Sequence, residues 1–198
     1  MKRSIVLLVY LLVISVILPP WSRGSEIEAP ITGEGLPHFE LPLPMLEAHV
    51  DYLGITGKSI FTISDIDAEV LIIEIFSMYC PHCQREASKI NRLYKKINEF
   101  NGNGEKIKII GIGVGNSDFE VGYFRKTYKI EFPLFSDPAF KLHKKFGEVR
   151  TPYFIGVKIN KQKSNSIFYS KLGAFLKADR FLEMIIEKSG LKQMEDKK

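Results

Sequence analysis

Two cysteines, the only two in the chain, lie close together in the stretch Met78–Gln84, which reads MYCPHCQ. Pro81 and His82 separate Cys80 from Cys83. Thiols spaced in this way occur as structural disulfides, as half of a metal site, or as a redox pair that exchanges disulfides. The elements around the pair and the compartment of the protein decide among these three chemistries.

A buried strand is expected just before the cysteines and a helix just after them. Residues 69–76 read EVLIIEIF, a β-branched run typical of a strand that is covered on both faces. Over residues 84–100 the apolar positions recur at helical spacing, at Ala87, Ile90, Leu93, Ile97 and Phe100. Residues 101–104, which read NGNG, are expected to end this helix. Cys80 therefore falls at a strand–helix junction.

The rest of the chain predicts an α/β domain with a central mixed sheet flanked by helices on both faces. The expected strands and hairpin are a strand and turn at 57–66, a buried strand at 106–114, and a hairpin formed by 152–159 and 166–173. Three further helices are expected. The first starts with a capping box at Ser117 and Glu120, the second extends from Asp137-Pro138 to Gly147, and the third ends near Gly190. The proline-rich residues 26–44 are expected to be irregular.

Composition and charge are those of an ordinary globular protein. The chain has 198 residues, 45% hydrophobic and 26% charged, which is enough to form a core without disulfides. The net charge is +5, but without Lys2, Arg3 and Arg23 the remaining 25 cations exceed the 23 acids by only two. Because no basic stripe interleaved with aromatic residues is present in the sequence, nucleic acid is not expected as a partner.

The N-terminus predicts export. Lys2 and Arg3 precede an apolar run over residues 5–18, which Pro19 and Pro20 end. This run is shorter than the roughly 20 residues of a comfortable transmembrane helix. We therefore expect residues 1–24 to be a signal peptide or an N-terminal membrane anchor that inserts through residues 5–18. The protein would then be extracytoplasmic, in the periplasm or on the outer face of the cytoplasmic membrane.

Three further segments follow from these boundaries. Residues 25–35 are expected to be a linker, residues 36–191 a single folded domain, and residues 192–198 a disordered tail.

The position of Cys80 favours redox chemistry over the other two uses of the pair. Pro81 suits the first turn of a helix, so Cys80 lies where unpaired backbone N–H groups and the helix dipole stabilise a thiolate. Cys83 follows one turn later and can close a disulfide, and His82 adds a hydrogen-bond donor. A structural disulfide around so short a loop would contribute only ~2 kcal/mol.

A structural zinc site needs four ligands, and the cysteine pair supplies two. The other histidines, His38, His49 and His143, are scattered along the chain and are expected at the surface or in packing. Thiol–disulfide exchange in an exported protein is therefore the favoured interpretation.

Several motifs between residues 36 and 191 resemble one known family. The stretches PHFELP (37–42), YCPHC (79–83), FPLFSDP (132–138) and VRTPYFIGV (149–157) are similar to those of TlpA/ResA-like extracytoplasmic thiol–disulfide oxidoreductases. The resemblance implies a thioredoxin-like fold and no cofactor. It also implies protein substrates with cysteine thiols or disulfides, together with a membrane or periplasmic electron donor or acceptor.

The resemblance also assigns roles to residues around the cysteines. It implies that Thr151 and Pro152 are joined by a cis bond and face the thiols, with the Thr151 backbone pairing with substrate and Pro152 keeping metals away. Tyr79, Pro81 and His82 are expected to contact substrate. From the residues alone, Pro152 has another interpretation, a proline that starts a strand.

Glu74 lies six residues before Cys80, on the same strand face as Ile72 and Phe76. Burial of a carboxyl group raises its pKa, because the charged form is poorly solvated. The resemblance implies a buried acid at this position that shuttles a proton for the second cysteine, Cys83. The alternative is an edge strand with Glu74 facing solvent.

Two features of the sequence point to opposite directions of exchange. The Pro81-His82 dipeptide is that of strongly oxidising relatives, in which a better-stabilised thiolate makes the disulfide the stronger oxidant. The overall architecture instead resembles reductases, for example those of cytochrome c maturation, and it rests on many more residues. Tyr79 departs from the tryptophan that is usual at its position. We therefore expect a reductase, with an oxidising dithiol oxidase as the alternative.

Two other activities occur on the same fold. Copper delivery would use both cysteines with a distant histidine such as His143 as soft ligands. A peroxidase would carry Pro and Thr or Ser ahead of its cysteine, whereas residues 73–80 read IEIFSMYC, without proline.

Overall fold

The structure, a computed structural model, describes residues 29–101, 106–160 and 165–191. The expected signal or anchor segment at 1–24 and the expected tail at 192–198 lie outside these ranges. Among the described residues, no helix is both long enough and apolar enough to cross a membrane.

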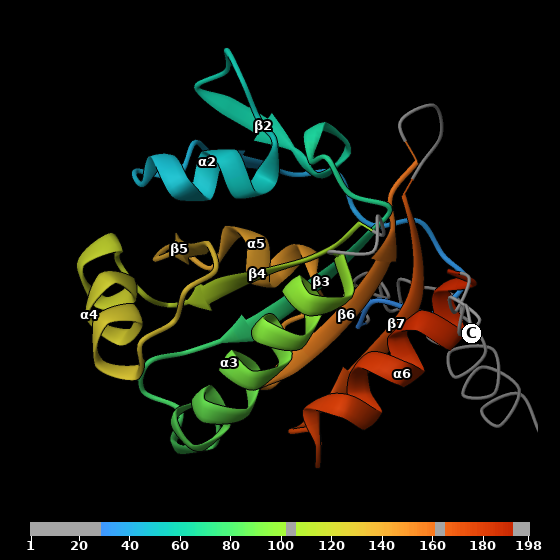
Figure 1. Cartoon of the computed structure of the whole chain (residues 1–198). Coiled ribbons are helices and arrows are strands. Elements are labelled where there is room, and N and C mark those ends of the chain that lie inside the picture. The colour runs from blue at the N-terminus through green and yellow to red at the C-terminus, as the bar shows by residue number, and fades with distance from the viewer. Residues whose placement is uncertain (1–28, 102–105, 161–164, 192–198) are drawn as a thin grey trace, which may run out of the picture.

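A five-stranded mixed sheet lies at the centre of the domain (Figure 1). Its order is β5 (Leu134–Asp137), β4 (Ile107–Val114), β3 (Val70–Phe76), β6 (Tyr153–Lys158) and β7 (Ser166–Leu172). The central strand β3 runs parallel to β4 and antiparallel to β6. The sheet is therefore parallel on one side of β3 and antiparallel on the other.

Helices cover both faces of this sheet, so the predicted architecture is confirmed. One face packs against α3 (Pro81–Asn101), α4 (Asp118–Tyr128) and α6 (Ala178–Ser189). The other face packs against α2 (Glu47–Leu53), α5 (Lys141–Lys145) and a short antiparallel ribbon of β1 (Glu40–Pro42) and β2 (Ile60–Thr62), which leads into a 3₁₀ turn at Ile63–Asp65. In Figure 1, α3 and α6 lie side by side in front of the sheet and α2 lies above it.

The central strand is buried along its whole length. Leu71, Ile73 and Ile75 face the cluster formed with α2 and the β1–β2 ribbon. Val70, Ile72 and Phe76 face the cluster formed with α3 and α6. Full burial of such side chains stabilises the fold by about 1.5–3 kcal/mol each. A strand with this pattern has no solvent-facing side, which removes the edge-strand alternative for Glu74.

The local signals named in the sequence are confirmed at several places. Ser117 and Glu120 form the predicted capping box, with the Ser117 N–H donating to the Glu120 carboxylate at 2.7 Å. β6 and β7 form the predicted hairpin, whose loop residues 161–164 lie outside the described residues. Gly190 ends α6 in the left-handed conformation that favours glycine.

The helix predicted from Asp137-Pro138 to Gly147 is wrong at its start. Asp137 ends β5, an edge strand that the sequence did not predict, and α5 begins only at Lys141. The Asp137 carboxylate still accepts a hydrogen bond from the His143 N–H at 2.8 Å. From the end of β5 it therefore contacts the first turn of α5. A four-residue strand is defined by its pairing with β4, which local pattern does not reveal.

The predicted irregular lead-in is wrong in part. Residues 40–42 form β1, and α2 follows directly after this segment, where no helix was predicted. The end of the expected linker is also attached to the sheet, because Gly33 N–H donates to Ile167 O at 2.8 Å and Gly35 bridges to Ser166. These contacts join segments that are far apart in the sequence.

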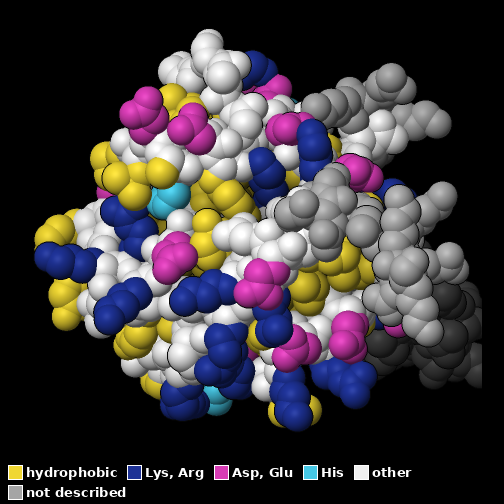
Figure 2. Space-filling model, viewed as in Figure 1, with side chains coloured by type: hydrophobic (Ala, Val, Ile, Leu, Met, Phe, Trp, Pro, Cys, Tyr) yellow, Lys and Arg dark blue, Asp and Glu magenta, His cyan; other side chains and the backbone are white. Residues whose placement is uncertain are grey.

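The face seen in Figure 2 carries charges of both signs over α3 and α6. Lys and Arg side chains there are interspersed with Asp and Glu side chains, and apolar side chains show between them. On this face the described residues form no continuous basic stripe.

Candidate redox site

The two cysteines lie at the junction of β3 and α3, as the sequence predicts. Cys80 directly precedes Pro81, the first residue of α3, and is partly exposed. Cys83 lies in the first turn of α3 and is 1% exposed. Both are free thiols in this structure. One thiol therefore faces outward and the other faces the core.

The Thr151–Pro152 bond lies directly against Cys80. This peptide bond is cis, as the resemblance implied, and Pro152 is buried. The Cys80 thiol donates to the Thr151 carbonyl at 3.4 Å, across 71 positions of sequence. The Pro152 carbonyl in turn accepts from the Gly173 N–H at 2.9 Å.

Two residues that the sequence analysis missed hold the loop before Cys80. The Met78 N–H donates to the side-chain oxygen of Asn116 at 2.8 Å, and the Gln84 side chain donates to the Met78 carbonyl at 2.8 Å. Asn116 follows β4 and is fully buried. The signal that could have found it is its place after a strand parallel to β3, because the carboxyl ends of parallel strands meet at one edge.

The pKa values of the two thiols shift in opposite directions. Burial acts to raise the pKa of Cys80, but hydrogen bonds from the Thr151 side chain and from the backbone N–H groups of Cys83 and His82 outweigh it. The Cys80 pKa is therefore lower than usual. Burial raises the pKa of Cys83 far above its usual value, and the neighbouring Glu74 and Cys80 charges raise it further. The outer thiol is the easier one to ionise.

Glu74 is buried beneath the cysteines. It is 3% exposed and lies on the face of β3 that packs against α3, as the sequence predicts. Burial raises its pKa to about 8, with further contributions from the negative charges of Glu86 and Cys80. Its strand partners are Gly111 on β4 and Phe154 on β6, neither of which brings a charge.

The other residues predicted to contact substrate lie beside Cys80 in the chain and are exposed. Pro81 and His82 are exposed, and Tyr79 is 63% exposed, with its hydroxyl donating to Glu120. His82 Nδ1 is 3.0 Å from the Arg85 guanidinium, which has only donors, so Nδ1 is the acceptor in this pair. An open groove of about 650 Å³ adjoins Tyr79; its lining is Met78, Tyr79, Ser117, Phe119, Glu120 and Tyr123.

Two of the histidines in the described ranges lie against backbone carbonyl groups. His49 is buried and its Nε2 lies 3.1 Å from the Glu131 carbonyl, while His143 Nε2 lies 2.9 Å from the Val149 carbonyl. Within the ranges that the structure covers, no three or more His, Cys, Asp and Glu residues form a group able to hold a metal ion.

Comparisons with known proteins agree with this fold. Residues 32–169 match the model of the AhpC/TSA family. The thiol-disulfide oxidoreductase ResA of Bacillus thuringiensis subsp. konkukian (strain 97-27) is 26% identical over 96 residues, which cover 48% of this chain and 52% of ResA. This chain thus spans about half the length of the curated relatives it matches.

Solved structures share the fold at low sequence identity. A Chlorobium tepidum protein proposed to be the thiol:disulfide interchange protein DsbE superposes with a TM-score of 0.59 at 14% identity, over 81% of this chain and 99% of that one. Peroxidoxin BcpB from Mycobacterium tuberculosis superposes with a TM-score of 0.57 at 15% identity, over 83% and 99%. The thioredoxin-like fold is confirmed, and it is common to proteins named for different chemistries.

Replacement of Glu74 by Gln tests its buried, protonated state through stability. Between the ordinary pKa of 4.5 and the native value of about 8, the unfolded chain has lost a proton that the native protein keeps. The stability of the wild type therefore falls as pH rises through this window. Because glutamine does not titrate, the free energy of unfolding of reduced Glu74→Gln should not show this fall. Between pH 5 and pH 8 we expect it to increase relative to that of the wild type by more than about 1 kcal/mol, as measured by urea denaturation.

The exposed Glu187 on α6 provides the matched control. Glu187→Gln should follow the wild-type pH dependence. If Glu74→Gln does so too, the carboxyl group of Glu74 is already ionised at neutral pH in the folded protein.

Proposed function

Because the chain belongs to the AhpC/TSA family and carries two unequal thiols at the start of α3, we propose that it is a thiol–disulfide oxidoreductase acting on proteins with cysteines. The observation that carries this proposal is the asymmetry of the pair. Cys80 is accessible and its pKa is lowered, whereas Cys83 is 1% exposed and its pKa is raised. An attacking thiolate and a protected second thiol are what stepwise exchange requires.

In the first step the Cys80 thiolate attacks one sulfur of a substrate disulfide. The substrate S–S bond breaks, its second sulfur leaves as a thiolate that takes up a proton, and a mixed disulfide joins Cys80 to the substrate. Cys83 stays protonated during this step, because its burial disfavours the charged form.

In the second step Cys83 gives its proton to the Glu74 carboxylate and attacks Cys80. The mixed disulfide breaks, the substrate leaves with both sulfurs reduced, and the enzyme keeps a Cys80–Cys83 disulfide that an external dithiol donor must reduce. The Cys80 charge contributes to the raised pKa of Glu74. Since the mixed disulfide removes this charge, the Glu74 pKa falls and Glu74 releases its proton to solvent. The carboxylate that remains is the base for Cys83. The two thiols carry the electrons, and the scheme uses no cofactor.

Substrate would lie across Cys80 between the cis-proline and the groove. We infer that the Thr151 backbone pairs with the substrate chain and that the buried Pro152 closes the inner side of the sulfur. Pro81, His82 and the exposed ring of Tyr79 would form the contact surface on the other side. A bulky substrate side chain next to the disulfide would fit the groove beside Tyr79.

Copper delivery is less well supported by this arrangement. It needs both sulfurs free to bind one ion, yet Cys83 faces the core. The candidate third ligand His143 has its Nε2 next to the Val149 carbonyl. Peroxide reduction is also less well supported, because Ser77, Met78 and Tyr79 before Cys80 include no proline.

Trapping of the mixed disulfide tests the exchange proposal. With a disulfide-linked peptide as substrate, Cys83→Ser should accumulate the enzyme–peptide adduct in most molecules, since the second step is blocked. Cys80→Ser should form none, because Cys83 is buried. Non-reducing mass spectrometry measures both. Equal trapping by the two variants would contradict the assignment of Cys80 as nucleophile, and peroxide consumption without adduct would favour a peroxidase.

The direction of exchange follows from the reduction potential of the Cys80–Cys83 pair. We propose a reductase, for example one that keeps cysteines of exported proteins reduced for cytochrome c maturation. We then expect a potential near or below about −200 mV by equilibration with glutathione or dithiothreitol, as in thioredoxin and glutaredoxins. A potential near about −120 mV, that of a strong oxidant, would instead make the protein a dithiol oxidase.

We also propose that the domain acts outside the cytoplasm, either released or anchored through residues 5–18. The support is the basic start and apolar run of residues 1–24. The electron donor or acceptor would then be a membrane or periplasmic protein.

A reporter enzyme that is active only outside the cytoplasm, fused after Leu191, should be fully active. Activity of a cytoplasmic reporter alone would overturn this location, and Lys2→Glu/Arg3→Glu serves as the control that impairs export.

A further inference from the structure

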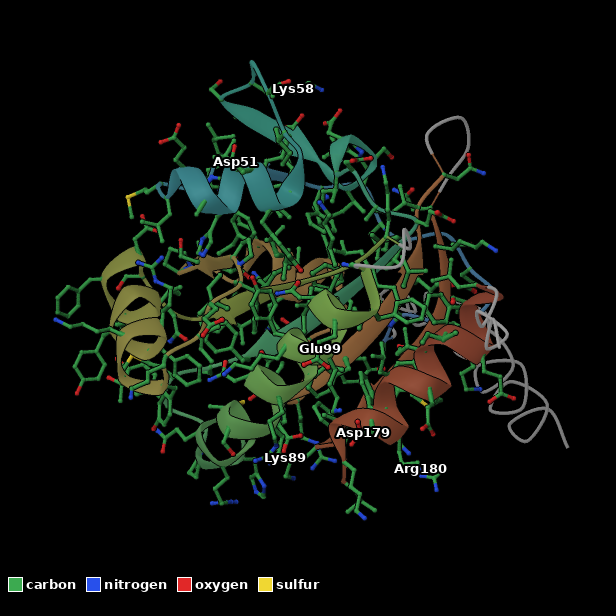
Figure 3. The ribbon with its side chains drawn as sticks, viewed as in Figure 1. Asp51, Lys58, Lys89, Glu99, Asp179 and Arg180 are labelled. Carbon is green, nitrogen blue, oxygen red and sulfur yellow. The ribbon has the colours of Figure 1, made fainter. Side chains whose placement is uncertain are left out.

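Three aromatic side chains are exposed in the groove beside the proposed redox site. Tyr79 is 63% exposed, Phe119 80% and Tyr123 56%, and all three line the groove. Tyr79 belongs to the loop before α3, whereas the other two belong to α4. In Figure 3, aromatic rings project from α4 away from the sheet. Because large rings gathered at a surface leave favourable contact area unused, they indicate a place where a partner binds.

A carboxylate lies in the same groove. Glu120, in the first turn of α4, is one of the lining residues. Its carboxyl group accepts from the Tyr79 hydroxyl, and its Oε2 accepts from the Ser117 N–H at 2.7 Å and from the Ser117 hydroxyl at 2.8 Å. These hydrogen bonds, the one from Tyr79 above all, lower the pKa of Glu120. Glu120 is therefore ionised at neutral pH.

The groups that hold Glu120 leave its charge uncompensated. A phenol, a hydroxyl and a backbone N–H are all neutral donors, and the helix dipole adds no net charge. A carboxylate has about four acceptor positions, so Oε1, which accepts from Tyr79, has room for one more donor. Arg85, the cation nearest to the cysteines in sequence, contacts His82 instead.

Ring faces next to a carboxylate match one kind of side chain. The face of an aromatic ring attracts a cation, and a carboxylate adds a charge-assisted hydrogen bond. An apolar side chain would gain nothing from Glu120, and an acidic one would be repelled. Among the described residues, the cation that lies over a ring is Lys108, 5.2 Å from the centre of Tyr52, so no described cation occupies the rings of the groove.

We propose that this groove binds the side chain of a lysine or arginine next to the reactive cysteine of a substrate polypeptide. The aliphatic stem would lie on the rings and the charged end would donate to Glu120 Oε1. Because Tyr79 directly precedes Cys80, a residue adjacent to the substrate cysteine would reach the groove. The inference names the substrate class of the redox site and so rests on the proposed function.

Rates of adduct formation with matched peptides test this specificity. In Cys83→Ser, Cys80 attacks the sulfur of a peptide cysteine that is disulfide-linked to 2-mercaptoethanol, which leaves as a thiol. Three peptides differ only in the residue after the cysteine: lysine, norleucine or glutamate. Each rate is divided by that of the same peptide with dithiothreitol, which corrects for intrinsic reactivity, and adducts are measured by mass spectrometry.

We expect the lysine peptide to react about fivefold faster than the norleucine peptide, the factor for one exposed cation–π contact together with one exposed ion pair. The glutamate peptide should be the slowest. The ratio of lysine to norleucine should decrease as salt is added, because exposed charges are screened.

Two variants locate the recognition in the groove. Glu120→Gln removes the charge but keeps the capping box, in which glutamine can replace glutamate. Phe119→Leu keeps an apolar side chain but removes a ring face. Each should lower the ratio of lysine to norleucine from about five to about two. Glu99→Gln, at an exposed glutamate near the end of α3 (Figure 3), removes the same charge elsewhere and should leave the ratio unchanged.

A norleucine peptide that reacts as fast as the lysine peptide would make the groove an apolar subsite and overturn the proposal. A lysine preference that persists in both groove variants would place recognition of the cation elsewhere, with the same consequence. If Glu120→Gln does not fold, an unchanged ratio in Phe119→Leu decides against the proposal.

Peptides with serine in place of the cysteine separate this inference from the proposed function. Their binding to the reduced wild-type chain is followed by NMR of ¹³C-labelled Phe and Tyr rings. Tighter binding of the lysine peptide, with no adduct from any cysteine peptide, would refute the exchange function while leaving the docking of a cation in place. Adducts that form at equal rates from all three cysteine peptides would refute the docking while leaving the exchange function in place.

Discussion

A carboxyl group enclosed under two thiols is the constraint around which this domain is arranged. Glu74 lies on a strand buried on both faces, where its charged form is poorly solvated and its pKa is about 8. The same enclosure keeps Cys83 protonated, whereas Cys80 lies far enough out to receive hydrogen bonds that favour its thiolate. The step in burial from the partly exposed Cys80 to the enclosed Cys83 and Glu74 thus separates three ionisable groups that are close in sequence.

The outer side of the site, around Cys80, depends on segments from three parts of the chain. The cis bond before Pro152 comes from the start of β6, Asn116 from the end of β4, and Gln84 from α3. Each contacts Cys80 or the loop just before it. The inner side of the site, around Glu74, depends on α3 and the segment before α6, which enclose Glu86. The site is therefore a property of the assembled sheet and its helices rather than of the cysteine motif alone.

The family and fold do not by themselves select a chemistry. A DsbE-type protein and a peroxidoxin superpose on this chain about equally well. The same backbone can therefore serve disulfide exchange or peroxide reduction, and the distinction comes from the residues at the site. Here these residues are a second thiol one turn after the first and a buried acid, Glu74, that raises the pKa of this second thiol.

The sequence by itself determined the elements whose signals are local. The β-branched run of β3, the periodicity of α3, the Ser117–Glu120 box and the glycine that ends α6 depend on near neighbours, and all are present. The spacing of Cys80, Pro81 and Cys83 placed the pair at a helix start for the same reason. Burial of Glu74 could be anticipated because its strand neighbours are uniformly apolar.

Only the tertiary structure decided the features that depend on distant partners. β1 and β5 are three- and four-residue strands that exist through pairing with β2 and β4, and α2 packs on the core that they help to enclose. The contacts of Asn116 with Met78 and of Glu86 with Phe175 join positions 38 and 89 residues apart. Side chains at such separations meet only when the whole sheet has formed, so no local pattern encodes their pairing, and the electrostatic surroundings of Glu74 depend on it.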